Sequence, residues 1–346
     1  MSEPPLFKDV FAEMSGPNGI SEASVRRVFD AIFAGQWQPT TVAGFLVALR
    51  LSKNETATVL AAASAAMRAV MVPVAHTFPL LLDTCGTGGD GSSSLNLSTG
   101  AAIIAAATGV PVAKHGNRAA TSRAGSADVL EALGIPLDVP GAAQAEVLKE
   151  ANIAFLFAQA HHPAMKYVMP ARRELGIRTL FNCIGPLANP ASATHQLIGA
   201  FDDAFRPVMA EALARLGARR AWIVRSEDGL DEVSPYAATR VTELDGGSIR
   251  EFLIAPEDFG LKRSAPGAIA GGDPQANAAA LEQILSGADH PARDAMVLNA
   301  AAALVVAEGG EPKRATEKAL ETLRSGAARQ TLDRLRHAAR ARRIAS

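Results

Sequence analysis

A glycine-rich segment at residues 83–100, DTCGTGGDGSSSLNLSTG, restricts more than any other what this chain can fold into. An apolar run at residues 78–82 precedes it and an Ala/Ile-rich run at residues 101–107 follows it, which predicts a strand, a loop and a helix. The loop glycines permit backbone angles closed to other residues and leave N–H groups bare to a ligand. We expect Ser98 or Thr99 to cap the helix, whose positive N-terminus then faces the same ligand. Backbone donors at a helix N-terminus form a phosphate-binding site.

Two better-known phosphate-binding loops fit this segment poorly. The Walker loop requires Gly-Lys-Ser or Gly-Lys-Thr, and the segment contains no lysine. Gly86, Gly88 and Gly91 match the GxGxxG pattern of a dinucleotide site, but the next apolar run, residues 110–113, ends in the basic sequence KHGNR instead of an acid. Asp90 would repel a bare phosphate, so the loop favours a sugar phosphate, or a pyrophosphate with a metal. The alternative is a tight turn with a solvated Asp90.

The composition favours a globular protein without a nucleic-acid partner. With 346 residues, 48% of them hydrophobic, the chain can form one large domain or two. A net charge of −1 gives no electrostatic reason to expect nucleic acid or an anionic membrane. Cys85 and Cys183 form neither a disulfide framework nor a zinc pattern. The N-terminus lacks the apolar region of a signal peptide, and Gly109 and Pro111 interrupt the most apolar stretch. We therefore expect a soluble, cytoplasmic protein with no membrane partner.

Residues 1–72 are expected to be entirely helical. Residues 52–55, SKNE, have the spacing of a capping box at the start of a fourth helix. The apolar faces exceed what four short helices can bury among themselves. We expect the remainder to pack both on the rest of the chain and on a second subunit.

From residue 78 onward, short apolar runs alternate with helical stretches, which predicts an α/β domain with a largely parallel sheet. We expect strands at residues 80–83, 110–113, 153–157 and 221–225. We expect helices between them at residues 98–108, 126–133, 142–151 and 206–216. Runs at 241–244 and 249–254 flank Asp-Gly-Gly and predict a hairpin, and residues 262–274 are expected to be a connection. Because ligands bind at the carboxyl ends of parallel strands, the polar motifs that follow them can converge.

Two of these motifs suit a phosphorylated ligand bound with a metal. Residues 114–118, KHGNR, precede a stretch rich in Thr, Ser and Gly, a combination that suits a polyanion held by a loop. Its alternative is an exposed polar turn. Asp231 and Glu232 are adjacent, so their carboxylates point in different directions and each could hold a separate Mg²⁺. Their alternative is a solvated acidic loop.

Histidine and arginine side chains stand close together between residues 161 and 173. His161 and His162 cannot share one helix face, so we expect them to form a pocket wall and not a zinc site. Pro163 suits the first turn of a helix, which Pro170 would bend. Arg172 follows this bend and could bind a carboxylate, although a solvent-facing arginine is the more ordinary interpretation of the sequence alone.

Taken together and in order, these motifs resemble the anthranilate phosphoribosyltransferase family. The resemblance extends over nearly the full length and rests on GTGGD (86–90), NLST (96–99), KHGNR (114–118), GSADVLEALG (125–134), HHPAMKYVMPARRELGIRTLFN (161–182), GPLANP (185–190) and GLDE (229–232). It implies a small helical domain, residues 1–72, joined by a returning segment near 167–190, and a large α/β domain, residues 73–346. It also implies a homodimer formed through the helical domain.

The resemblance implies an activity as well. The family transfers the phosphoribosyl group of phosphoribosyl pyrophosphate (PRPP) to the amine of anthranilate, giving N-(5′-phosphoribosyl)anthranilate and pyrophosphate in L-tryptophan biosynthesis. The implied cofactor is Mg²⁺, two ions per monomer. The substrates are PRPP and anthranilate. The alternatives are an enzyme like the pyrimidine nucleoside phosphorylases, which share the fold, and a non-catalytic relative that binds nucleic acid.

Site residues follow by matching the family motifs onto this sequence. The expected PRPP contacts are Gly86, Gly89, Asp90, Ser94, Asn96, Leu97, Ser98, Thr99, Lys114, His115, Gly116, Asn117, Arg118, Ala119, Ala120, Thr121, Ser122 and Ser126. The expected anthranilate contacts are Gly86, Asn117 and Arg172. The expected metal ligands are Ser98, Asp231 and Glu232. No general base is expected, because the weakly basic amine of anthranilate need not lose a proton before it attacks.

The sequence departs from the usual family pattern in three places. These are residues 92–95, where Ser-Ser-Ser-Leu replaces a mixed run, Arg123-Ala124 in place of Lys-Ser, and Ser234-Pro235-Tyr236 after the acidic pair. The departures concern substrate affinity and loop order, and leave the reaction class unchanged.

Overall fold

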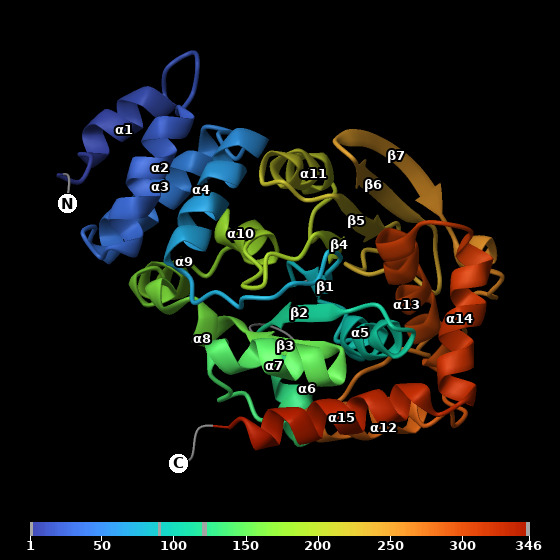
Figure 1. Cartoon of the computed structure of the whole chain (residues 1–346). Coiled ribbons are helices and arrows are strands. Elements are labelled where there is room, and N and C mark those ends of the chain that lie inside the picture. Colours follow the sequence, from blue (N-terminus) through green and yellow to red (C-terminus); the bar gives the residue numbers. More distant parts are fainter. Residues whose placement is uncertain (1–2, 89–90, 120–122, 344–346) are drawn as a thin grey trace.

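The structure, a computed structural model, describes residues 3–88, 91–119 and 123–343. Figure 1 shows a group of helices that carries the N-terminus, beside a larger part in which helices cover a central sheet. None of the described helices is both long and apolar enough to cross a membrane.

The N-terminal part is helical, as the sequence predicts. Its helices are α1 (Phe7–Met14), α2 (Glu22–Phe33), α3 (Pro39–Leu51) and α4 (Ala57–Val70). The capping box predicted at residues 52–55 is wrong, because Thr56 is the N-cap of α4 and its hydroxyl accepts a hydrogen bond from Val59 N–H. The buried Asn54 side chain instead accepts a hydrogen bond from Ile20 N–H and donates one to Met14 O. Asn54 therefore connects the start of α4 to α1 and the α1–α2 loop, and the N-cap residue is Thr56, two positions later.

A later segment of the chain returns to these helices. It contains the 3₁₀ helix η1 (Pro163–Tyr167), α9 (Met169–Leu175) and α10 (Phe181–Leu187), which contact α2, α3 and α4 respectively. The Phe181 ring lies 5.6 Å from the ring of Phe29 on α2, centroid to centroid. The N-terminal helices therefore bury part of their apolar surface against the rest of the chain. The division into domains at residues 1–72 and 73–346 stays a prediction.

A seven-stranded sheet forms the centre of the larger part. Its strands are β1 (Leu82–Gly86), β2 (Val112–Gly116), β3 (Ile153–Phe157), β4 (His195–Gly199), β5 (Arg220–Ser226), β6 (Thr239–Asp245) and β7 (Ser248–Ile254). The spatial order is β3-β2-β1-β4-β5-β6-β7. The first five of these in space are parallel, and β6 and β7 add an antiparallel hairpin at one edge.

Helices cover both faces of this sheet (Figure 1). Those of the larger part are α5 (Leu97–Ala107), α6 (Ser126–Ala132), α7 (Gly141–Ala151), α8 (Ala158–His161), α11 (Phe205–Arg215), α12 (Pro274–Leu285), α13 (Arg293–Glu308), α14 (Pro312–Arg324) and α15 (Ala327–Ala341), with the 3₁₀ helix η2 (Pro256–Phe259). On β5, Trp222 and Val224 belong to one buried cluster with α5 and α13, whereas Ala221 and Ile223 belong to another with α4, α10 and α11. The period-two alternation of a strand therefore supplies both cores.

Most predicted helices and strands are present in the structure, but their first and last residues often differ from the prediction. The strand predicted at 153–157 coincides with β3, and the hairpin is confirmed as β6 and β7. Strand β4 was not predicted, because it holds the polar residue Gln196, which is buried and donates a hydrogen bond to Pro186 O. The predicted caps Ser98 and Thr99 are wrong, since Asn96 is the N-cap of α5.

Candidate active site

Several of the predicted site motifs meet where the parallel strands end. After β1, Gly88 N–H donates a hydrogen bond of 3.1 Å to Asp231 Oδ2, and at the start of α5, Ser98 N–H donates one of 3.3 Å to Glu232 Oε1. The two adjacent acids therefore reach different partners, as expected. Both partners are backbone N–H groups of the predicted phosphate loop and helix terminus.

Gly199, at the end of β4, allows the acidic loop around Asp231 to lie close to the glycine loop. This residue was not identified from the sequence. A Cβ at this position would lie 1.6 Å from Asp231 O, so only glycine admits the acidic loop here. The same glycine accepts a 2.9 Å hydrogen bond from Thr87 N–H through its carbonyl oxygen. Gly199 thus brings the glycine loop and the acidic loop against one strand end.

Lys114 lies beneath the N-terminus of α5. Its side chain is only 3% exposed, and Nζ donates hydrogen bonds to Thr84 O and, over 3.3 Å, to Ser98 Oγ. Burial lowers the pKa of Lys114, and the negative charges of Asp83 and Glu232 oppose that change. The lysine is therefore placed to add positive charge just below the helix terminus.

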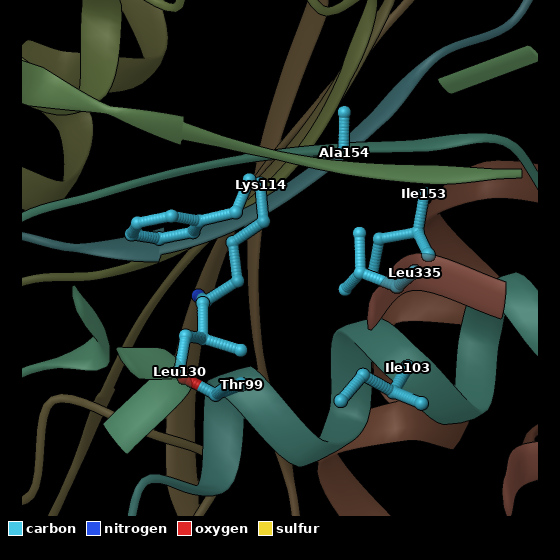
Figure 2. A pocket seen from close by; sticks show the side chains of 8 residues that line it. Thr99, Ile103, Lys114, Leu130, Ile153, Ala154 and Leu335 are labelled. Atoms are coloured by element: carbon cyan, nitrogen blue, oxygen red, sulfur yellow. The ribbon is translucent and has the colours of Figure 1, made fainter. Parts of the chain in front are cut away.

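A small cavity of about 10 Å³ adjoins Lys114 and Thr99. Figure 2 shows the lysine extending from its strand toward α5, with Ile103 and Leu335 also on the cavity wall. Thr99 Oγ1 is buried and has no hydrogen-bond partner among the described residues. The cavity has room for at most about one water molecule, so it is a packing defect below the site and not a substrate pocket.

Asp83 is a second residue that the sequence did not single out as functional. It is fully buried on β1, where it accepts hydrogen bonds from His115 N–H (3.0 Å) and Asn189 Nδ2 (2.8 Å). Burial raises the pKa of Asp83, whereas the nearby Lys114 lowers it. A carboxylate within an apolar strand run was the available sequence signal.

Two histidines pair in the interior next to the KHGNR motif. His115 Nδ1 lies 3.1 Å from Gly185 O, and His115 Nε2 lies 3.2 Å from His162 Nε2. Since a carbonyl oxygen can only accept, Nδ1 of His115 carries the proton and His162 Nε2–H is the donor between the rings. Burial is the main cause that lowers the pKa of His115 well below its ordinary value and that of His162 to about 4. Both rings are therefore neutral at pH about 7.

The KHGNR arginine is already engaged by acids. Arg118 Nη1 lies 2.9 Å from both Asp128 Oδ1 and Glu131 Oε2 on α6. Asp128 also accepts hydrogen bonds from the N–H groups of Ala119 and Gly125, so it holds together the two described ends of the loop. In this structure Arg118 organises the loop, and its charge is largely balanced by its neighbours.

Arg172, on α9, makes no ion pair with any described residue. Its guanidinium lies 5.8 Å from the centroid of the Phe181 ring and donates one long hydrogen bond, 3.5 Å, to Asn182 Oδ1. Desolvation lowers the pKa of Arg172. A partly buried guanidinium with so little compensation suits an anionic ligand. Among the described residues, no hydrogen bond or ion pair joins Arg172 to Gly86 or Asn117, its two expected partners at the anthranilate site.

Three further groups of predicted contacts differ in how the structure places them. The side chains of Leu97 and Thr99 are fully buried, so only their backbone can meet a ligand. Gly116 packs tightly, because a Cβ there would lie 2.3 Å from Ser126 Oγ. The predicted contacts Gly89, Asp90, Ala120, Thr121 and Ser122 lie outside the described residues.

Asp231 and Glu232 suit magnesium, which binds few protein ligands, better than a metal that is coordinated by protein side chains alone. Across residues 3–88, 91–119 and 123–343, no group of three or more His, Cys, Asp or Glu side chains could hold a metal ion. Two carboxylates facing phosphate-binding N–H groups match Mg²⁺, which keeps several waters and binds substrate phosphates. Ser98 Oγ accepts from Lys114 and retains a second lone pair for a ligand.

Comparison with known proteins agrees with this arrangement. The family described as "Glycosyl transferase family, helical bundle domain" matches residues 14–71, and "Glycosyl transferase family, a/b domain" matches residues 79–329. Anthranilate phosphoribosyltransferase of Methylobacterium radiotolerans is 48% identical over 330 residues, which cover 95% of each chain. The chain belongs to the anthranilate phosphoribosyltransferase family.

Solved structures of anthranilate phosphoribosyltransferases share the whole fold. The enzyme from Thermus thermophilus superposes with a TM-score of 0.89 at 42% identity, covering 96% of this chain and 99% of that one. The enzyme from Saccharomyces cerevisiae in complex with PRPP and Mg superposes with a TM-score of 0.89 at 30% identity, covering 97% and 98%. The predicted fold class, a helical N-terminal domain with a mostly parallel α/β domain, is confirmed. The comparisons favour the transferase over the nucleoside phosphorylase and the nucleic-acid-binding relative.

Proposed function

We propose that this enzyme transfers the phosphoribosyl group of PRPP to the amine of anthranilate, with release of pyrophosphate, in L-tryptophan biosynthesis. The observation that carries the proposal is the meeting of Asp231 and Glu232 with the N–H groups of Gly88 and Ser98. Anion donors and metal-binding acids at one strand edge suit a pyrophosphate that leaves with magnesium. Membership in the family, which includes the yeast complex with PRPP and Mg, supports the substrate and the metal.

Asp231, Glu232 and Ser98 would hold the magnesium, which we propose as two ions per monomer. When bound, Mg²⁺ neutralises charge on the leaving pyrophosphate. The chain's own contribution is electrostatic and positional. Lys114 Nζ and the backbone N–H groups stabilise the same negative charge, in a site where Lys114 is shielded from water.

No base is needed in this scheme. The amine of anthranilate is a weak base that attacks with its own lone pair, so the enzyme needs to orient it. We propose that Arg172 binds the anthranilate carboxylate and that Gly86 and Asn117 contact the ring or amine. The buried, neutral His115 and His162 shape the wall beside Asn117.

The other motif-matched residues stay proposed PRPP contacts. Of these, the structure lends most support to Ser98, Lys114 and Asn96, which surround the start of α5. We also propose that the enzyme works in the cytoplasm.

We propose a homodimer formed through the helical part. Residues of α1, α3 and α9 line an apolar groove of about 470 Å³: Phe7, Phe11, Ala43, Gly44, Val47, Ala48, Leu51 and Leu175. Leu51 is 78% exposed and Phe11 is 50% exposed, an arrangement that favours coverage by a second copy. Sedimentation should give a dimer for the native chain and a monomer for Leu51→Asp; a native monomer at micromolar concentration would refute the proposal.

Anthranilate fluorescence tests the function directly. The purified chain, PRPP and Mg²⁺ should remove the signal only when all three are present. If PRPP binds in calorimetry but the signal persists, the site serves a different acceptor, and the roles of Asn117 and Arg172 fall.

A further inference from the structure

The N-terminus of α5 carries an asparagine that does not cap its own helix. An N-cap asparagine ordinarily accepts a hydrogen bond from the N–H two or three residues later, through its side-chain oxygen. Asn96 is the N-cap of α5, yet its side chain makes no such bond. The N–H groups that it would reach are those of Ser98 and Thr99, and the Ser98 N–H instead faces Glu232.

The reason lies on α12, about 180 positions further along the chain. Asn277 Nδ2 donates a 3.0 Å hydrogen bond to Asn96 Oδ1, and so occupies the atom that would otherwise cap the helix. Asn96 Nδ2 then donates 3.1 Å to Ala124 O, at the end of the KHGNR loop. Asn277 thus determines the orientation of the Asn96 amide, and through it joins the two loops proposed to bind PRPP.

Asn277 is itself held in place. Its side chain is only 2% exposed, and its Oδ1 accepts a 2.7 Å hydrogen bond from Gly272 N–H, which leaves Nδ2 to face Asn96. The chain just before Gly272 runs beside the glycine loop, where Leu95 N–H donates to Ile269 O (2.8 Å) and Gly271 N–H donates to Ser93 O (3.0 Å).

The connection is also tied to the acidic loop. Tyr236 Oη accepts a 3.1 Å hydrogen bond from Ile269 N–H. Tyr236 belongs to the Ser-Pro-Tyr sequence that departs from the family pattern. This sequence therefore helps to hold the connection that positions Asn277.

We propose that Asn277 is a positioning residue for PRPP, which keeps Asn96 from capping α5 and holds the Asn96 amide between the glycine loop and the KHGNR loop. This inference rests on the proposed function of the site. Asn277 affects the binding of PRPP alone, because Arg172, the proposed anthranilate ligand, lies on α9 in the returning segment.

The first test is Asn277→Ala. Asn96 Oδ1 then loses its donor and turns toward the helix, so the KM for PRPP and its dissociation constant in calorimetry should rise about two- to tenfold, the worth of one hydrogen bond. The KM for anthranilate and kcat at saturating PRPP should stay within about twofold. An unchanged PRPP affinity, or an equal loss in every constant, would overturn the proposal.

A double-mutant cycle with Asn96→Ala tests the route of the effect. If Asn277 acts through Asn96, the substitution Asn277→Ala should add less than about twofold once Asn96 has been removed. A full multiplicative effect in that background would show that Asn277 acts by another route and would overturn the inference.

Asn152→Ala is a matched control. Asn152 Nδ2 also makes two hydrogen bonds, to Ala106 O and Val110 O, but it lies at the opposite end of the sheet, just before β3. Its loss should lower the thermal midpoint and leave the PRPP affinity unchanged.

The two proposals can fail separately. A native chain that binds PRPP without consuming anthranilate would refute the proposed function alone, since calorimetry still measures the effect of Asn277→Ala on PRPP binding.

Discussion

Replacing His162 with glutamine should remove much of the acid sensitivity of the fold. His162 is 5% exposed and donates its Nε2–H to His115 Nε2, so a second proton would have to enter a buried ring. Burial lowers the pKa of His162 to about 4. In the unfolded chain the ring titrates near its ordinary pKa of about 6.5, so the unfolded state binds more protons between the two values. The contribution of neutral His162 to the stability of the fold is therefore complete above about pH 6.5 and is lost as the pH falls toward about 4.

The magnitude follows from the same linkage. At about 1.4 kcal/mol per pH unit, His162 alone should lower the free energy of unfolding by about 2 kcal/mol by pH about 5 and about 3 kcal/mol by pH about 4. His115, whose pKa is lowered in the same direction, adds to the loss. At neutral pH, His162→Gln should cost about 1 kcal/mol, because the glutamine amide replaces the hydrogen bond and the packing of the ring only in part, so the two stability curves should converge and then cross on acidification.

Urea unfolding at a series of pH values, followed by tryptophan fluorescence, measures this directly. Trp37 reports the helical part and Trp222 the sheet. His337→Gln on α15 is the control for replacing a histidine as such, because His337 is exposed. Parallel curves for the native chain and His162→Gln would refute the assignment of a buried neutral His162.

Three further predictions concern the site itself. Asp231→Ala combined with Glu232→Ala should reduce Mg²⁺-dependent turnover at least about a hundredfold, because the leaving pyrophosphate loses its metal; near-normal turnover in the fluorescence assay would contradict the metal assignment. Arg172→Ala should raise the KM for anthranilate about tenfold or more and the KM for PRPP much less, as expected for a lost charge-assisted hydrogen bond; an equal change in both would argue against carboxylate binding. Gly199→Ala should push the Asp231 backbone away, costing about 1–3 kcal/mol in thermal unfolding and most of the PRPP affinity measured by calorimetry; retention of native affinity would show that the close approach is not needed.

The helix and strand order could be predicted because it depends on local patterns. Strands buried on both faces form continuous apolar runs, as in the segment that became β3. Strand β4 was missed for the converse reason: Gln196 interrupts its apolar run, and a hydrogen bond to the carbonyl of Pro186 makes that polar side chain tolerable in the interior. The cap of α5 was placed two or three residues too late, because Asn96, Ser98 and Thr99 are all residue types that favour the N-cap position and local preference alone does not choose among them.

The sequence by itself determined the phosphate-binding character of the glycine loop, the pairing of a helical part with an α/β part, and the family resemblance. These depend on residue types at short, fixed spacings. Only the tertiary structure decided which groups share the site with that loop. Gly199 admits the acidic loop, Asp83 holds the backbone of His115, and Asn277 orients Asn96, each across a contact between distant parts of the chain. Close contacts of this kind depend on how packed elements are placed in space, and a one-dimensional pattern carries no record of that placement.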